Sequence, residues 1–274
     1  MHRFYLPKLA NEIISAENHI MKYINLHVSK WILGLTPFLL SFTFLVKSHI
    51  HVYMIGDSTM ASYTTETAPL SGWGMPFSFF FDSSVTVLNE AQSGRSTRTF
   101  IEEKFWQPIS DNLKPGDYVL IQFGHNDEVP SKKSSTTPKD FQANLIRYIS
   151  ETRAKNAYPV LFTPVARRIF NDSGRIVETH GEYAALVRKV AAEYKVPLID
   201  MDRKSQIFFQ SLGPETSKLC FNYLAPGENP HYPGGNIDDT HFNELGARRV
   251  AEIALAEIIN QKLELADRIY KPAE

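Results

Sequence analysis

The sequence contains one cysteine, Cys220, in 274 residues, so no intrachain disulfide can form. This scarcity does not exclude export, because a chain that buries a large core needs no disulfide to fold. Charge of one sign is not in excess either, since 29 Lys and Arg stand against 30 Asp and Glu, a formal net charge of −1. Nucleic acid is therefore not expected as a partner. Internal repeats and low-complexity tracts are also absent.

The sequence lacks an uncharged run as long as a membrane-spanning helix usually needs, which is about 20 residues. The nearest is WILGLTPFLLSFTFLV, the sixteen residues 31–46, and it contains Pro37. A signal peptide with cleavage after Ser48 fits this short run better than a stable anchor. A buried core helix is the alternative interpretation.

The N-terminus has two parts. Residues 1–20 include acidic side chains, whereas the stretch that begins at Met21 makes a better n-region for a signal peptide, which favours a start there. We therefore expect an N-terminal extension and signal peptide over residues 1–48 and one globular domain over 49–274. Export to the periplasm or the cell exterior follows, with membrane contact only through an uncleaved signal segment.

After this segment, short apolar runs alternate with helical patterns. With 43% hydrophobic residues the chain can bury a real core. Apolar residues recur at helical spacing in 182–194 and 244–259. Runs typical of buried parallel strands cover 50–55, 84–89, 118–123, 158–164 and 196–201. This alternation predicts an α/β fold: a doubly wound, flavodoxin-like, five-stranded parallel sheet with helices on both faces in three layers.

Small and polar residues follow several of these strands. Gly56-Asp57-Ser58 comes after the first, Gly94 lies in a turn after the second, and Gly-His-Asn-Asp follows the third at residues 124–127. A further stretch, DDTHF, precedes the last helix. Because such sheets carry their sites at the carboxyl ends of the strands, these turns are expected to form one site.

The ordered set of Ser58, Gly94, Asn126 and His241, with Asp238 before the histidine, resembles the SGNH (GDSL-like) hydrolase superfamily over residues 50–260. Within it, motifs such as GDSTM, GRSTRTF, TPVARRIF and DDTHFNELGA resemble the rhamnogalacturonan acetylesterase branch. The resemblance implies a serine esterase that removes acetyl groups from the pectin backbone and acts on an acetylated polysaccharide or oligosaccharide. The alternatives are an acetylesterase on xylan, a lipase or lysophospholipase-type esterase, and a non-catalytic glycan-binding module.

Elementary chemistry supports these roles. The Ser58 hydroxyl is a poor nucleophile until a base takes its proton, and His241 is the candidate base. Asp238, three residues earlier, can hold the second imidazole nitrogen across one turn, and Asp239 is the rival. Asp238, Asp239 and His241 could instead bind a metal, but a serine triad needs none, so neither metal nor cofactor is expected.

An oxyanion hole needs preorganised donors. The backbone N–H groups of Ser58 and Gly94 and the side-chain amide of Asn126 are the candidates, and Gly94 is expected to permit close approach because it lacks Cβ. No Gly-x-Ser-x-Gly elbow surrounds Ser58, which disfavours the other common α/β esterase architecture. Asn126 and Asp127 could also simply terminate a strand, and His125 could either line the site or pack beneath it.

Four further residues lie in or near loops that should border the site. Arginine suits the carboxylates of a galacturonate-containing polymer through its bidentate fork. The candidates for substrate contact are Trp73, Arg95, Arg167 and Arg168.

Overall fold

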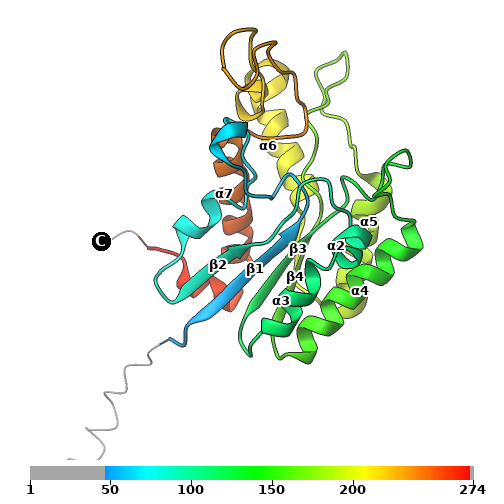
Figure 1. Cartoon of the computed structure of the whole chain (residues 1–274), viewed down its shortest axis with the longest axis vertical. Helices are drawn as coiled ribbons and strands as arrows, with labels where there is room; N and C mark the ends of the chain where they lie inside the picture. The colour runs from blue at the N-terminus through cyan, green and yellow to red at the C-terminus, as the bar shows by residue number, and fades with distance from the viewer. Residues whose placement is uncertain (1–46, 272–274) are drawn as a thin grey trace, which may run out of the picture. The chain divides into compact units, whose positions relative to one another are not determined.

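The computed structural model describes residues 47–271 (Figure 1). The predictions of a signal peptide over 1–48 and a start at Met21 therefore fall almost entirely outside the described residues. No helix within 47–271 is long and apolar enough to cross a membrane.

A sheet of five parallel strands in the order β2-β1-β3-β4-β5 forms the centre of the fold. This is the flavodoxin-like order that the sequence predicts. The last strand is shorter than expected because Asp200 is already the N-cap of the next helix, with its side chain accepting from the Arg203 N–H. The strands are β1 Ile50–Gly56, β2 Val85–Asn89, β3 Tyr118–Gln122, β4 Tyr158–Phe162 and β5 Leu198–Ile199.

Helices cover both faces of the sheet, so the predicted three-layer α/β/α architecture is confirmed (Figure 1). One face carries α6 (Met201–Thr216) and α7 (Glu244–Asn260). The other face carries α2 (Thr97–Glu102), α3 (Trp106–Asn112), α4 (Pro138–Ala154) and α5 (Gly181–Tyr194). Short 3₁₀ helices lie at Thr65–Thr67, Pro76–Phe80, Ser217–Cys220 and Glu264–Arg268.

The alternation of side chains along β1 explains the two layers. Val52 and Met54 are fully buried against the α6 and α7 side, whereas Tyr53 and Ile55 are buried against the α2–α5 side. Because both sides of the strand are covered, its sequence is apolar at successive positions rather than alternating.

The strand order places the candidate site. β1 lies between β2 and β3, with Met54 opposite Asn89 and Gly56 opposite Gln122. The chain passes from β1 to β2 on one side and then back across β1 to β3 on the other, which makes this the topological switch point where such sheets carry their sites. The polar turns that follow β1, β2 and β3 therefore meet at one edge of the sheet.

Candidate active site

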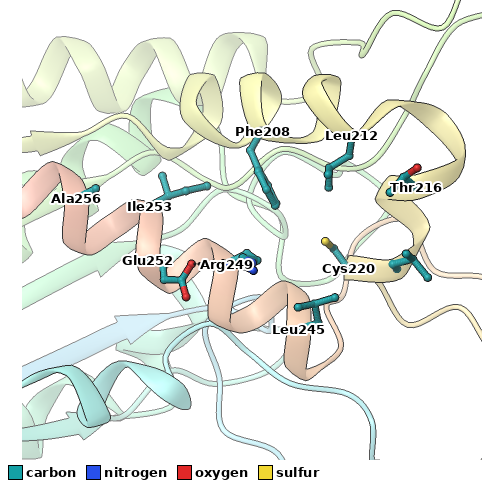
Figure 2. A pocket seen from close by; sticks show the side chains of 10 residues that line it. Phe208, Leu212, Thr216, Cys220, Leu245, Arg249, Glu252, Ile253 and Ala256 are labelled. Atoms are coloured by element: carbon teal, nitrogen blue, oxygen red, sulfur yellow. Dashed lines mark hydrogen bonds and ion pairs between the residues drawn. The ribbon is translucent and has the colours of Figure 1, made fainter.

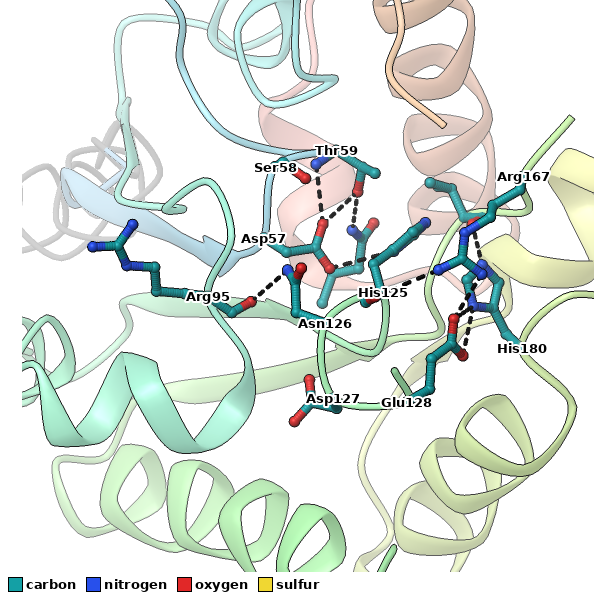
Figure 3. Close-up of polar contacts among 12 residues, drawn as sticks. Asp57, Ser58, Thr59, Arg95, His125, Asn126, Asp127, Glu128, Arg167 and His180 are labelled. Atoms are coloured by element: carbon teal, nitrogen blue, oxygen red, sulfur yellow. Dashed lines mark hydrogen bonds and ion pairs between the residues drawn. The ribbon is translucent and has the colours of Figure 1, made fainter. Parts of the chain in front are cut away.

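The turn after β1 is held by Asp57. Its carboxylate Oδ1 accepts hydrogen bonds from the Thr59 N–H at 3.0 Å and the Thr59 hydroxyl at 2.8 Å, as expected for a residue that fixes a turn (Figure 3). The Tyr63 hydroxyl donates to the Ser58 carbonyl at 2.8 Å. These bonds fix the backbone at Ser58, a residue that is only 7% exposed.

Ser58, His241 and Asp238 form one hydrogen-bonded series. His241 Nε2 lies 2.9 Å from Ser58 Oγ, and His241 Nδ1 lies 2.8 Å from Asp238 Oδ2. The other Asp238 oxygen accepts from the backbone N–H groups of Thr240 and His241. Burial alone raises the pKa of Asp238, but hydrogen bonds and attraction to His241 outweigh burial, and the pKa is lowered. A carboxylate held ionised in this way favours the Nδ1–H tautomer, which leaves Nε2 free to accept.

Asp239 has different partners. Its carboxylate accepts from Arg168 Nε at 2.6 Å and from the Tyr223 hydroxyl. Arg168 also donates to the Pro214 carbonyl at 2.6 Å. Asp238 is therefore the carboxylate that contacts the imidazole, while Asp239 holds the loop before His241 to the end of α6.

Besides the Ser58 N–H, the candidate oxyanion donors come from the loops after β2 and β3. Asn126 Nδ2 donates to the Arg95 carbonyl at 2.9 Å, which places the amide beside the Gly94–Arg95 segment (Figure 3). Gly94 has φ +79°, and a Cβ built on it meets no atom within 4 Å. The left-handed backbone favours glycine at this position, and the close approach of a substrate oxygen stays a prediction.

Asp127 anchors the same two loops to each other. Its carboxylate accepts from the Thr97 N–H at 3.0 Å and the Thr97 hydroxyl at 2.6 Å, at the first turn of α2. Its backbone carbonyl accepts from the Thr136 N–H at 2.9 Å. Burial raises the pKa of Asp127 to about 7, although the hydrogen bonds from Thr97 act in the opposite direction. Asp127 therefore does more than terminate a strand.

A buried polar cluster lies beneath the site (Figure 3). His125 is 3% exposed, and its Nδ1 lies 3.3 Å from Asp57 Oδ2. Its ring meets that of His180 edge-on at 4.5 Å. Glu128 pairs with His180 at 3.0 Å and with Arg167 at 2.6 Å. Burial lowers the pKa of His125 to about 4, so this histidine is neutral at physiological pH and packs beneath the site.

Sequence reasoning did not identify this cluster. His180 and Glu128 lie 52 residues apart, and only packing of the start of α5 against the loop after β3 brings them together. Lys132, whose Nζ donates to Asn126 Oδ1 at 2.7 Å, was also missed. A lysine in an exposed polar loop carries no sequence signal for such a contact.

The four candidates for substrate contact differ in how exposed they are and in their partners. Trp73 is fully buried, and its indole N–H donates to Gln122 at 2.8 Å, so the structure contradicts the prediction that it contacts substrate. Arg168, 9% exposed at its side chain, is held by Asp239 and serves the fold. Arg167 is partly exposed but paired with Glu128. Arg95 also pairs with a carboxylate, Glu103 at 2.8 Å, but it is the most exposed of the four, with 37% of its side chain open to solvent.

Two hollows differ in character. One of about 650 Å³ is lined by polar and charged groups that include Lys132 and Arg167, and it lies beside Asn126 through Lys132. The other has a volume of about 550 Å³ and lies between α6 and α7, with a mostly apolar lining that includes Leu212 and Ile253 (Figure 2). Neither lining includes a triad or oxyanion residue, and the polar hollow adjoins the candidate site only through the bond from Lys132 to Asn126.

Comparisons with known proteins agree with this geometry. The model of the GDSL-like Lipase/Acylhydrolase family matches residues 54–249. The chain is 41% identical over 227 residues to rhamnogalacturonan acetylesterase RhgT of Bacillus subtilis (strain 168), covering 82% of this chain and 96% of that protein. It is 28% identical over 238 residues to the rhamnogalacturonan acetylesterase of Emericella nidulans, covering 79% and 87%.

Solved structures show the same fold. The crystal structure of YxiM from Bacillus subtilis superposes with a TM-score of 0.69 at 29% identity, covering 79% of this chain and 58% of that one. The acetylxylan esterase Axe2 of Geobacillus stearothermophilus gives a TM-score of 0.56 at 18% identity, covering 78% and 95%, which is evidence for the fold alone. The chain therefore belongs to the GDSL-like lipase/acylhydrolase family and is a carboxylic ester hydrolase.

Proposed function

We propose that this esterase removes O-acetyl groups from a pectic polysaccharide, the rhamnogalacturonan backbone, through an acetyl-enzyme on Ser58. The observation that carries the proposal is the series from Asp238 through His241 to Ser58, with contacts of 2.8 and 2.9 Å. The substrate class is supported by the relative with 41% identity, which the chain covers over 96% of its length and which is a rhamnogalacturonan acetylesterase.

Acylation begins with the Ser58 hydroxyl. Oγ attacks the acetyl carbonyl carbon while His241 Nε2 takes the hydroxyl proton. Asp238 stabilises the imidazolium that forms and keeps its orientation. The bond from the carbonyl carbon to the sugar oxygen then breaks, and His241 returns the proton to that oxygen. The deacetylated sugar leaves, and the acetyl group stays on Ser58.

Deacylation repeats the chemistry with water. His241 takes a proton from a water molecule that attacks the acetyl carbonyl, and the proton returns to Ser58 as acetate leaves. In both steps the carbonyl oxygen becomes an oxyanion. Asn126 and the backbone N–H groups of Ser58 and Gly94 are the donors that receive it, and their fixed geometry lowers the barrier.

A serine-directed fluorophosphonate tests the nucleophile. We expect a single covalent label, located on Ser58 by peptide mass spectrometry, and loss of both label and turnover in Ser58→Ala. Ser83→Ala is the matched control, because Ser83 is an exposed serine outside the site. Turnover that survives in Ser58→Ala contradicts the mechanism.

We also propose that the protein is exported. The support is the short uncharged run 31–46 with the basic n-region that begins at Met21. A polymer such as pectin is met outside the cell, so export is consistent with the proposed substrate.

A further inference from the structure

The Asn126 amide is held from both ends. Its Nδ2 donates to the Arg95 carbonyl at 2.9 Å, and its Oδ1 accepts from Lys132 Nζ at 2.7 Å. Asn126 itself is almost fully buried, whereas Lys132 reaches it from an exposed loop position.

The chemistry of the two partners permits one orientation of the amide. An ammonium group only donates, so the atom facing Lys132 has to be the amide oxygen. A backbone carbonyl only accepts, so the atom facing Arg95 has to be the amide nitrogen. One Nδ2 hydrogen is used by Arg95, and the second remains for another acceptor. In the proposed mechanism that acceptor is the oxyanion on the carbon attacked by Ser58.

Lys132 lies in a loop that hydrogen bonds hold in place. Its N–H donates to the Val129 carbonyl at 3.0 Å, and its carbonyl accepts from the Ser135 N–H at 3.0 Å. The guanidinium of Arg98, on α2, donates to the carbonyls of Lys133 and Ser135. The loop that carries the ammonium is therefore tied both to itself and to the helix after Gly94.

The charge of Lys132 is directed at the amide. In residues 47–271 no carboxylate forms an ion pair with Lys132, whereas Arg167 in the same hollow is neutralised by Glu128 at 2.6 Å. A hydrogen bond from a charged donor is about twice as strong as a neutral one. It also polarises the acceptor group, which strengthens the bonds that this group donates in turn.

We propose that Lys132 is a positioning residue that acts through Asn126: it fixes the amide orientation and strengthens the remaining N–H toward the oxyanion. This inference rests on the proposed role of Asn126 in the oxyanion hole. Since the oxyanion exists only in the transition state and the tetrahedral intermediate, the effect belongs in kcat and not in substrate binding.

The first test compares Lys132→Met with Lys133→Met, its neighbour in the same exposed loop. We expect Lys132→Met to lower kcat about 10-fold with KM within twofold, on p-nitrophenyl acetate and on acetylated glycan alike. Lys133→Met should match wild type, and Lys132→Arg should restore most of the rate. Thermal melting of each variant checks that the fold is kept. An unchanged kcat in Lys132→Met overturns the inference, as does a loss confined to KM on the acidic glycan.

A double-mutant cycle identifies the path of the effect. Asn126→Ala is expected to lower kcat about 10²–10³-fold, and adding Lys132→Met should then cost nothing further. A full additional 10-fold loss in that background means that Lys132 does not act through Asn126. If Asn126→Ala loses kcat but Lys132→Met does not, this inference alone fails. If Asn126→Ala leaves kcat unchanged, the oxyanion role in the proposed function fails with it.

Discussion

The contact between Asp238 and His241 Nδ1 decides which imidazole nitrogen can accept the Ser58 proton. Replacing Asp238 by Asn keeps the size but allows the opposite tautomer, with the proton on Nε2. We expect Asp238→Asn to lower kcat on p-nitrophenyl acetate about 10³–10⁴-fold. Asp239→Asn, one residue along, should lower the melting temperature by loosening Arg168 and leave kcat within about threefold. Equal loss of kcat in both variants contradicts the assignment.

Burial of His125 gives a pH dependence of stability whose sign can be worked out. The folded-state pKa is lowered to about 4, whereas an unfolded histidine titrates near its ordinary value of about 6.5. As pH falls through this window the unfolded chain binds a proton that the folded chain does not, so stability is lost. The free energy of unfolding should fall by about 3 kcal/mol between pH 6.5 and 4 through this group.

Urea unfolding at several pH values measures this effect. In His125→Asn, whose amide nitrogen can still face Asp57, the decline between pH 6.5 and 4 should be shallower than in wild type. The matched control is His231→Asn at an exposed histidine, which should keep the wild-type slope. Identical slopes for wild type and His125→Asn would mean that His125 does not titrate with folding.

Sequence patterns predict the individual residues of the site unevenly. The triad can be predicted from the sequence. Ser58 lies in a turn directly after a strand, and Asp238 lies three residues before His241, close enough to contact its imidazole. Trp73 is not foreseeable, because a tryptophan between two glycines can face either solvent or core, and the Gln122 acceptor that fixes it comes from β3. Lys132 is not foreseeable either, since its role depends on how the loop after β3 folds back over Asn126.

At the scale of elements, side-chain hydrogen bonds from Asn126 and Asp127 join the loops after β2 and β3. Asp127 binds the first turn of α2 through Thr97, and Asn126 binds the Arg95 carbonyl in the loop before that helix. Asp127→Ala leaves the Thr97 N–H and hydroxyl without an acceptor in a buried place. It should cost about 1–3 kcal/mol of unfolding free energy and also lower kcat, because Gly94 shifts with the loop.

Asp172→Ala is the matched control for this prediction, since Asp172 is an exposed loop residue that takes no part in these hydrogen bonds. Urea unfolding gives the stability, and kcat on p-nitrophenyl acetate gives the effect on the site. A stable Asp127→Ala variant with wild-type kcat would show that the hydrogen bonds between Asp127 and Thr97 do not position Gly94.

The strands and two of the helices follow from sequence patterns to within a few residues. α5 and α7 match the helical spacing in 182–194 and 244–259, because a helix with one buried face shows its 3.6-residue period directly. The strand predicted over 196–201 is only Leu198–Ile199 in the structure, because Asp200 caps the next helix. A pattern of apolar residues does not indicate where such a cap ends a strand. α6 carries a break at Gly213, with φ +74°, followed by Pro214.

For the whole molecule, export is tested by expression from Met21 in a Gram-negative host. We expect soluble periplasmic protein whose N-terminus, read by Edman sequencing or intact mass, lies near His49. Protein that retains residues 31–46 in the membrane fraction indicates an uncleaved anchor. Soluble full-length protein in the cytoplasm favours the alternative of a buried core helix.

Substrate preference is also a property of the whole surface, because a polymer lies across several loops while one acetyl group reaches Ser58. The apolar groove between α6 and α7 has no triad residue in its lining, so it is not placed to hold the acyl chain of an ester that is attacked by Ser58. Acetyl esters should therefore be cleaved faster than long-chain acyl esters. Acetylated rhamnogalacturonan, which carries carboxylates, should be deacetylated faster than acetylated xylan, and acetate release from the two polymers measures this.

The charge contribution can be isolated at Arg95, whose side chain is partly open while its backbone carbonyl holds Asn126. Arg95→Ala should lower kcat/KM on acetylated rhamnogalacturonan about threefold, because an exposed ionic contact is worth at most about 1 kcal/mol, and should leave p-nitrophenyl acetate unaffected. The preference over xylan should shrink as salt screens the charges. Arg168→Ala, by contrast, should lower the melting temperature without changing the preference, since the Arg168 side chain is only 9% exposed. Equal, salt-independent rates on both polymers would indicate a general carbohydrate acetylesterase, and faster cleavage of long-chain esters would overturn the glycan substrate altogether.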